Sequence, residues 1–471
     1  MTPKSLRRAL LAISAGVLIS SPALSQSGGQ APMPPGAYPV IQQCAPNQPV
    51  PTLPDVWSTT ALLTPFDQSE LKFAKVIVGS AINTMLATTI GLESGTRDQF
   101  LIVEDKTYRG ITDQNGNPQY VPIWQDNWLV PPTNLFYGKG CSCEGISYVS
   151  GVEAEAWKCP SGAAQPAAAG HRGAAQGKAT EYDWFWFTAA ASPAERVPLR
   201  FLMSRPDNDQ KLPVLGDAAL VNMPEVTTAT GSSAEAQELG KLAEAAASGG
   251  VIPDSQLRLG DPSIPGVSFA GCGSFTLPTW PQTAYSDGAL FAVGGSYTSM
   301  LIYYDYPNLR EVSKIRGQDG SVNDTRLTSD TTWEIFWPSP GPDQGAPVQC
   351  QGGLKNVGIW HPNWPTRDAC ACRAGIAANS PLNPSGDDLN ALSCFFGGSA
   401  YIQSWYSTAG RPHLFYETNA GDLDLIDYYN WIPNAQIDPS VFDDPGQCMQ
   451  GQSDIVAPFC ADCHGGEIGW N

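Results

Sequence analysis

The stretch Ser-Tyr-Thr-Ser-Met-Leu-Ile-Tyr-Tyr-Asp-Tyr, residues 296–306, sets the fold class of this chain. It is rich in β-branched and aromatic residues, and Pro307-Asn308 breaks it before a charged segment at 311–316. Farther along, residues 331–337 alternate polar with large apolar side chains until Pro338 ends the pattern. Alternation with a period of two is typical of a strand with one buried face. These residues predict a run of antiparallel strands.

The composition of the whole chain favours the same class. Gly and Pro occupy 47 and 41 positions, and only 15% of the residues are charged. Such a composition favours short strands joined by turns over long helices. We therefore expect a mainly β protein of curved antiparallel sheets, with α+β as the alternative. A helix over 68–78 is the candidate first element, and it would give a sheet folded around a helix.

The first 25 residues have the form of a secretory signal peptide. Lys4, Arg7 and Arg8 precede an apolar run at 9–19, and the small-residue site Ala-Leu-Ser at 23–25 follows it. The run is too short to cross a bilayer core of about 30 Å. No Cys follows it directly, and no later stretch is long enough to span. The sequence predicts export to the periplasm or beyond, without a transmembrane segment.

The mature chain is strongly acidic. Without the signal peptide it has 23 basic and 45 acidic residues, a net charge of −22. Nucleic acids and anionic membrane surfaces are bound by basic patches. The charge balance therefore argues against both as partners.

The second half of the chain repeats the first in outline. The closest match is Cys141-Ser142-Cys143 with Cys370-Ala371-Cys372, and the other matches follow in the same order. They are Cys44 and Thr52-Leu53-Pro54 with Cys272 and Thr276-Leu277-Pro278; Trp57 with Trp280; Met85-Leu86 with Met300-Leu301; Asn115-Gly116 with Asp319-Gly320; Trp124 with Trp337; Trp184-Phe185-Trp186 with Trp405-Tyr406; Arg196–Phe201 with Arg411–Phe415; and Asp217 and Met223-Pro224 with Asp427 and Ile432-Pro433. We infer two tandem copies; a single large β-rich domain is the alternative.

Changes in composition mark the boundaries. They separate a signal peptide at 1–25, a Pro/Gly-rich arm at 26–51, copy one at 52–226 with a flexible insert at 161–180, a linker at 227–250 with a helix at 234–247, copy two at 251–448, and a Cys-rich tail at 449–471.

Twelve cysteines in an exported chain are expected to be oxidised. Each predicted unit has an even number: Cys44, Cys141, Cys143 and Cys159; Cys272, Cys350, Cys370, Cys372, Cys394 and Cys448; Cys460 and Cys463. Side chains at i and i+2 of a strand are nearly parallel, which is a poor geometry for a mutual bond. Each Cys of a Cys-x-Cys is thus expected to pair with a more distant partner in its own copy. Connectivity is otherwise open.

The second copy resembles the ependymin and LolA-like group. The resemblance rests on the Tyr-Tyr-Asp-Tyr strand, the Cys-Ala-Cys, the Trp-Tyr and Arg-Pro-x-x-Phe pair, and the closing Val-Phe-Asp-Asp-Pro-Gly-Gln-Cys. It covers residues 278–448 and, more faintly, 54–224. It implies a curved antiparallel sheet around helices and a cavity for lipid or another apolar ligand. The duplication, the insert and the tail depart from that group.

A curved sheet rich in aromatic residues gives either a packed core or an apolar pocket, and the sequence does not separate the two. The candidate lining residues are the aromatics of the best strands, with register left open. They are Tyr297, Tyr303, Trp333 and Trp337 in copy two and Trp184 and Trp186 in copy one.

The sequence identifies no catalytic residue. Its four histidines are His171 in the insert, His361 among aromatics, His413 in an alternating strand, and His464 in the tail. Ser69-Glu70-Leu71-Lys72 has no accompanying penicillin-enzyme motifs, and Asp113–Asn117 lacks the Glu that closes a calcium loop. A binding protein is favoured over an enzyme.

The tail contains Cys460-Ala461-Asp462-Cys463-His464, which resembles the haem-attachment motif of c-type cytochromes. In that case Cys460 and Cys463 bind haem c and His464 ligates its iron. Only seven residues follow His464, too few for a haem-enclosing fold, so a tail disulfide without cofactor is favoured. Three functions stay open: an exported protein that binds a hydrophobic or lipid-like small molecule, a periplasmic haem c protein, and an extracellular glycan-binding or structural protein.

Overall fold

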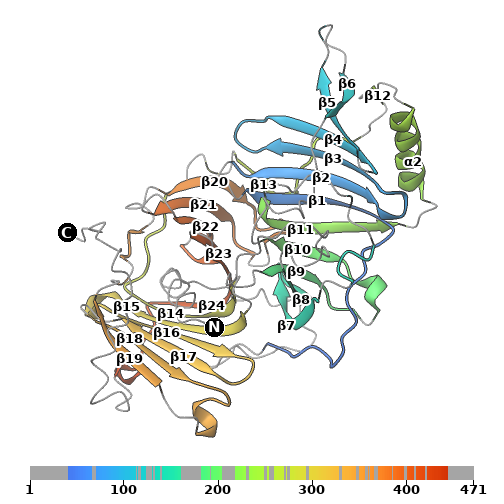
Figure 1. The fold of residues 1–471 in the computed structure, drawn as a ribbon. Coiled ribbons are helices and arrows are strands. Elements are labelled where there is room, and N and C mark those ends of the chain that lie inside the picture. The colour runs from blue at the N-terminus through green and yellow to red at the C-terminus, as the bar shows by residue number, and fades with distance from the viewer. Residues whose placement is uncertain are drawn as a thin grey trace, which may run out of the picture.

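The computed structural model describes residues 41–443, except 66–69, 105, 113, 115–117, 124–129, 131–132, 138–139, 161–181, 191, 204–217, 230–232, 249–251, 254–258, 270–271, 273–275, 293–295, 328–330, 346–348, 356–358, 360, 365–369, 384–385, 397–399, 408–409 and 420–421. The described chain forms two antiparallel sheets, one after the other in sequence (Figure 1). The predicted fold class is confirmed. The predicted signal peptide, the predicted insert at 161–180 and the tail lie outside the described residues.

The first sheet has twelve strands in the order β12-β6-β5-β4-β3-β2-β1-β11-β10-β9-β8-β7. β-branched and aromatic residues dominate the central strands, as a half-buried pleated surface favours. The strands are β1 Val56–Pro65, β2 Lys72–Gly79, β3 Thr84–Gly91, β4 Arg97–Val103, β5 Lys106–Thr112, β6 Pro118–Ile123, β7 Ser142–Val149, β8 Val152–Pro160, β9 Tyr182–Thr188, β10 Pro198–Leu202, β11 Ala218–Ala229 and the two-residue β12 Ile252–Pro253.

The second sheet also has twelve strands, in the order β13-β20-β21-β22-β23-β24-β14-β15-β16-β17-β18-β19. They are the two-residue β13 Val267–Ser268, β14 Thr283–Ala292, β15 Ser296–Asp305, β16 Arg310–Gly317, β17 Val322–Leu327, β18 Thr331–Trp337, β19 Gln349–Lys355, β20 Ala371–Ile376, β21 Leu389–Phe396, β22 Ala400–Ser407, β23 Pro412–Asn419 and β24 Asp422–Pro433. In Figure 1 this sheet is bent, with β20–β23 on one side and β14–β19 on the other.

The two sheets share one topology, in which β1 to β11 correspond in order and pairing to β14 to β24. The register agrees in detail, because a β-bulge directly follows Cys143 in β7 and Cys372 in β20. Tracing cross-strand partners through each sheet makes Trp186 equivalent to Trp405 and Asn222 equivalent to Asp427. Two residues are equivalent when they occupy the same position in the register of the two sheets.

Some of the motif matches behind the predicted repeat are out of register. In three of them the member in copy one lies one or two strands farther along its sheet than the member in copy two. Met223-Pro224 and Ile432-Pro433 lie on the equivalent strands β11 and β24 but are offset along them, and Asp427 is equivalent to Asn222, not to Asp217. These matches were found by comparing residue types along the sequence. The position of a residue in a sheet is fixed instead by the partner it pairs with on the neighbouring strand. The displaced pairs are Met85-Leu86 with Met300-Leu301, Asn115-Gly116 with Asp319-Gly320, and Trp124 with Trp337, of which residues 115–116 and 124 are outside the described residues although their flanking strands are placed.

The cysteine prediction is confirmed where the side chains are described. No disulfide there joins the two members of a Cys-x-Cys, and the pairing is the same in both copies. The bonds are Cys44–Cys143 with Cys272–Cys372, which span 99 and 100 residues, and Cys141–Cys159 with Cys370–Cys394, which span 18 and 24. The side chain of Cys350 and all of Cys448, Cys460 and Cys463 lie outside the described part of the chain.

Removing the Cys44–Cys143 disulfide by a double Ser substitution should lower the free energy of unfolding by about 2 to 4 kcal/mol, because the unfolded chain regains the freedom of a long loop. Urea unfolding followed by tryptophan fluorescence measures this loss. The equivalent double Ser variant at Cys272 and Cys372 is the matched control and should lose a similar amount. A large difference between the two would contradict a common stabilising role.

The helix predicted over 68–78 is wrong. Strand β2 begins at Lys72 and pairs along its length with β1 and β3. Three consecutive β-branched residues, Val76-Ile77-Val78, favour the strand because their side chains pack well on a pleated surface. The sheet therefore does not fold around a helix at this position.

The helix predicted in the linker is present as α2, Ala234–Ala247. The hydroxyl of Ser233 accepts a hydrogen bond from the N–H of Ala236 and caps its first turn. The helix buries Leu239, Leu242 and Ala246 against Leu86, Leu101, Val103, Tyr108 and Tyr120 of the first sheet. β12 then pairs with β6, so residues 252–253 extend the first sheet, although the sequence placed them in copy two.

Both faces of each sheet contribute residues to buried cores. The "arm face" of the first sheet carries Ala74, Val76, Met85, Phe185 and Phe201, and it packs against Val50 and Leu53 of the arm. The arm face of the second sheet carries Met300, Ile302, Tyr406 and Phe415, and it packs against Leu277 and Trp280. The opposite "contact faces" of the two sheets share one core. Leu62, Phe73, Trp184 and Trp186 supply the first side of it, and Tyr297, Ala391, Trp405 and Leu414 the second.

Candidate functional site

The six predicted lining residues divide into two groups. Trp184 and Trp186 of β9 meet Tyr297 of β15 in the core between the contact faces, where all three are buried. The two indole rings are stacked with centroids 6.1 Å apart, and the Tyr297 ring stands edge-on to Trp184 at 6.3 Å. Burial raises the pKa of the Tyr297 hydroxyl well above its ordinary value. These aromatics hold the two copies together.

The other three predicted residues lie away from this core. Tyr303 is on the same face of β15 as Tyr297 but six residues along, which is about 20 Å in a strand. Trp333 and Trp337 share one face of β18, and both are partly exposed. The ammonium group of Lys314 stands 5.9 Å from the centroid of the Tyr303 ring. The structure thus does not bring the six residues to one place.

A buried ion pair joins the copies beside the aromatic core. Arg200 of β10 donates from Nε to Oδ1 of Asn222 at 2.9 Å, and from Nη1 to Oδ2 of Asp427 in β24 at 2.7 Å. Its guanidinium also lies over the ring of Trp186, 5.6 Å from the centroid. Since Asn222 and Asp427 are equivalent positions, one Arg side chain bridges the two copies at matching points.

His413 belongs to strand β23 of the second sheet, next to the core between the contact faces. Its imidazole is buried and parallel to the indole of Trp405, with ring centroids 6.3 Å apart. Burial, together with the positive charge of Arg200, lowers the pKa of His413 to about 3. The side chain is therefore neutral at physiological pH. It is a packed residue of the sheet, as the alternating strand indicated.

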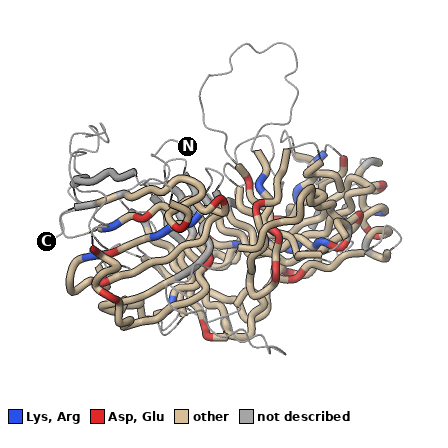
Figure 2. Tube along the Cα trace, turned by 90° about the horizontal axis from the view of Figure 1, so that it is seen from below, with Lys and Arg blue, Asp and Glu red and all other residues tan. Residues whose placement is uncertain are grey.

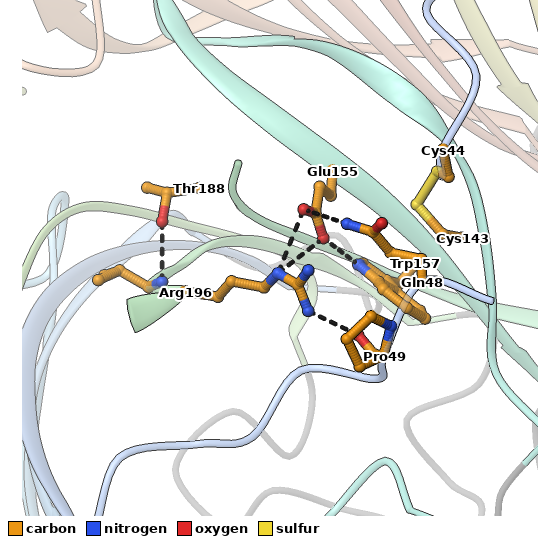
Figure 3. A network of polar contacts seen from close by, with 9 residues as sticks. Cys44, Gln48, Pro49, Cys143, Glu155, Trp157, Thr188 and Arg196 are labelled. Atoms are coloured by element: carbon orange, nitrogen blue, oxygen red, sulfur yellow. Dashed lines mark hydrogen bonds and ion pairs between the residues drawn. A yellow bond between two sulfur atoms is a disulfide. The ribbon is translucent and has the colours of Figure 1, made fainter. Parts of the chain in front are cut away.

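A second buried ion pair fixes the arm to the first sheet (Figure 3). Arg196 and Glu155 are 1% and 2% exposed, with Nε 3.0 Å from Oε2. Glu155 also accepts hydrogen bonds from Trp157 Nε1 at 3.0 Å and from Gln48 Nε2 at 2.8 Å. Arg196 in turn donates from Nη1 to the carbonyl oxygen of Pro49 at 2.6 Å. The carboxylate and the guanidinium thus each bind the arm, next to the Cys44–Cys143 disulfide.

Arg196→Met should loosen the arm. The substitution leaves the Glu155 carboxylate buried without its cation and removes the hydrogen bond to Pro49. Limited proteolysis should then cut residues 41–55 at least tenfold faster than in the parent protein. Arg97→Met is the control, because Arg97 pairs at 2.8 Å with Asp261, which is 65% exposed. Equal cleavage rates in all three proteins would show that Arg196 does not hold the arm to the first sheet.

The arm faces of the two sheets differ in chemistry. Along β3 the first sheet presents Met85 and Ala87, whereas the equivalent positions of β16 are Glu311 and Ser313, which are buried. The first arm face is covered by the arm and by residues 133–137, both of which are irregular chain. Phe136 fills it with ring centroids 4.7 Å from Phe185 and 5.4 Å from Phe187. This apolar surface under an irregular cover is the candidate functional site.

Sequence reasoning missed both ion pairs. Glu155 lies between two alanines inside a buried strand, and an isolated charge in such a position is the signal that could have marked it. Arg200 and Asp427 are 227 residues apart, so no local pattern connects them. In Figure 2 the basic and acidic residues of the described chain are interspersed along both sheets, not separated by sign.

The described residues contain no cluster of three or more His, Cys, Asp or Glu side chains that could hold a metal ion. None of the helices in this part of the chain is long and apolar enough to cross a membrane. The haem-attachment motif at Cys460, Cys463 and His464 lies outside the described part, so haem c and the tail disulfide both stay predictions. His361 packs edge-on against Tyr306 at 5.2 Å, and its Nδ1 accepts a hydrogen bond from the Asn363 N–H.

Comparison with known proteins gives no family. No family model matches the chain, and no curated protein matches it. Similar solved structures include an uncharacterised conserved protein from Thermus thermophilus, with 19% identity, 40% of this chain and 85% of that chain covered, and a TM-score of 0.24. They also include MucB in complex with MucA(peri), with 11% identity, 81% and 94% covered, and a TM-score of 0.21. A LolA superfamily protein from Nitrosomonas europaea has 11% identity, 37% and 96% covered, and a TM-score of 0.19. These TM-scores are too low to establish a shared fold.

Proposed function

We propose that this chain is an exported binding protein that holds an apolar, lipid-like ligand on the arm face of its first sheet. The observation that carries the proposal is the apolar surface of Val76, Met85, Ala87, Ile102 and Phe185 under irregular chain. Within the described residues, the arm part of this cover is held by the Arg196–Glu155 pair and the Cys44–Cys143 disulfide, whereas few backbone hydrogen bonds hold residues 133–137 to the rest of the protein. Such segments open more readily than strands do. The disulfides fit a chain that folds in an oxidising compartment.

The arm face is a better site than the aromatic core between the copies. A ligand at Trp184, Trp186 and Tyr297 would have to separate two sheets and break the ion pair of Arg200 with Asp427. On the arm face a ligand has to displace side chains of the cover, of which Leu53 and Phe136 together account for roughly 5 kcal/mol of apolar burial. About six buried methylenes, at ~0.8 kcal/mol each, replace that loss. The ligand therefore needs an apolar chain of more than about six methylenes, as in an acyl lipid.

The test has two parts, carried out on the full-length exported protein. Mass spectrometry of an organic extract should find a lipid-like molecule bound to the purified protein. A neutral apolar probe, N-phenyl-1-naphthylamine, should gain fluorescence on binding. Phe136→Ala should tighten probe binding several-fold, because the side chain that competes for the arm face is removed.

Two variants serve as controls for the location. Phe442→Ala removes a buried ring from the second copy and should leave probe affinity unchanged. Trp333→Ala with Trp337→Ala tests two of the predicted aromatics that lie away from the core between the copies, and it should also leave probe affinity unchanged. Loss of probe binding in this double variant would move the site to the second sheet. If the extract holds no lipid and the native protein binds no probe, the proposed function is wrong.

A further inference from the structure

The duplication gives a template for the chain that follows the second sheet. In the first copy the chain leaves β11, forms α2 on the contact face beside β2, β3 and β4, and reaches the sheet edge as β12. There Ile252 pairs with Tyr120 of β6. The corresponding chain of the second copy begins after β24, at residue 434, and residues 444–471 of it lie outside the described residues.

The described part of that chain, residues 434–443, begins on the same side of its sheet as the corresponding chain of the first copy. A short 3₁₀ helix, η7 at Pro439–Phe442, packs against β16, the counterpart of β3. Phe442 is buried, and the guanidinium of Arg310 lies 4.2 Å from its ring centroid. Arg310 shares a face of β16 with Val312, and Val312 is equivalent to Leu86, which α2 covers in the first copy.

The pairing of the cysteines indicates which strand of the second sheet receives the chain that follows β24. Four of the six cysteines of the second copy are bonded to each other, which leaves Cys350 and Cys448. Cys350 pairs with Ile335 across the edge strand β19, and Tyr120 pairs with Gly110 across β6. Tracing the register through both sheets makes Cys350 equivalent to Tyr120. The remaining cysteine of the sheet thus occupies the position at which the first copy receives the returning chain.

The distance fits a bond to Cys448. From β16 to β19 there are three strand spacings, about 14 Å, and Cys350 is in register with Lys314, four residues or about 13 Å along the strand from Arg310, so the separation is about 20 Å. The five residues from Asp443 to Cys448 reach at most about 17 Å when extended, and the disulfide itself spans about 5.5 Å between Cα atoms, so together they cover this separation. Residues 455–459, Ile-Val-Ala-Pro-Phe, follow within the same segment and supply apolar side chains for a sheet face on which Trp333 and Trp337 are partly exposed.

We propose that residues 444–471 dock on the contact face of β16–β19 and that Cys448 forms a disulfide with Cys350. The two thiols lose two electrons and two protons to a protein disulfide of the oxidising compartment, which leaves as a dithiol by thiol–disulfide exchange. The segment then has the role in the second copy that α2 and β12 have in the first. The proposal is independent of the ligand proposed above.

Peptide mapping of the native full-length protein tests the bond. Cleavage before aspartate without reduction gives peptide 343–367, whose only Cys is Cys350, and places Cys448, Cys460 and Cys463 on the separate peptides 444–453, 454–461 and 462–471. We expect 343–367 linked to 444–453, and the link should disappear on reduction. A free thiol at Cys350, or its link to 454–461 or 462–471, would overturn the proposal.

Proteolysis tests the docking itself. Cys350→Ser should expose residues 444–471 and raise their rate of cleavage at least tenfold over the parent protein. Cys44→Ser with Cys143→Ser removes a disulfide of the first copy and should leave that rate unchanged. If the parent protein is cut in this segment as fast as Cys350→Ser, the segment does not dock, even where the bond is present.

Discussion

Asp427→Asn should lower the free energy of unfolding by about 3 to 5 kcal/mol, because it leaves the Arg200 guanidinium buried without its counter-charge. Arg200→Leu should cost a similar amount by leaving Asp427 unpaired. Both substitutions install the residue of the equivalent position, since Leu414 is equivalent to Arg200 and Asn222 to Asp427. Urea unfolding measures both losses.

The double variant Arg200→Leu, Asp427→Asn separates the ion pair from the rest of the interface. With neither charge buried, the loss should be well below the sum of the two single losses, because removing both charges also removes their desolvation cost. Arg373→Leu is the control for an exposed contact, since Arg373 Nη1 pairs with Glu93 across the copies at 2.7 Å with both partners partly exposed. Additive losses in the double variant would contradict the coupling.

Acid should destabilise the protein through His413. Its pKa is about 3 when folded and 6.5 when unfolded, so between these values the unfolded chain binds a proton that the folded chain does not. Stability therefore falls as the pH drops below 6.5, by about 1.4 kcal/mol per pH unit, and this contribution levels off below pH 3. Between pH 6.5 and about 4 the loss is roughly 3 kcal/mol.

Unfolding of the parent protein and of His413→Gln at several pH values isolates this contribution. The glutamine variant should have a flatter pH dependence by that amount, because it lacks the titrating group. His361→Gln is the matched control and should keep the parent slope. Parallel curves for the parent and His413→Gln would show that protonation of His413 is not linked to unfolding.

The sequence predicted the features that depend on interactions between residues close together in the chain. The two Cys-x-Cys motifs identified equivalent strands, and the parallel side chains of a strand excluded a bond within each motif. The helix at 234–247 followed from its Ala, Glu and Leu content between two Gly/Ser-rich stretches. Each of these inferences uses a local property, which a single sequence contains in full.

Register and long-range charge pairing could not be predicted in the same way. Met85 and Met300 look alike in sequence but lie on non-equivalent strands, because pairing with neighbours, not residue type, places a strand. The candidate lining aromatics were predicted with their register left open, and the structure places Trp184 and Trp333 in different environments. The buried pair of Arg200 and Asp427 depends on the packing of the two sheets, which no local pattern describes.

The contact between the copies is that of a homodimer fused into one polypeptide. In a true homodimer, symmetry gives both subunits the same residue at every position. An Arg at position 200 would then occur twice, as would its neighbour at 222. Within one polypeptide that constraint does not apply, so one half can carry the cation and the other the anion. The same freedom lets one arm face carry Met85 where the other carries Glu311. Two halves of one topology in a single polypeptide thus have an asymmetric interface and interiors of different chemistry.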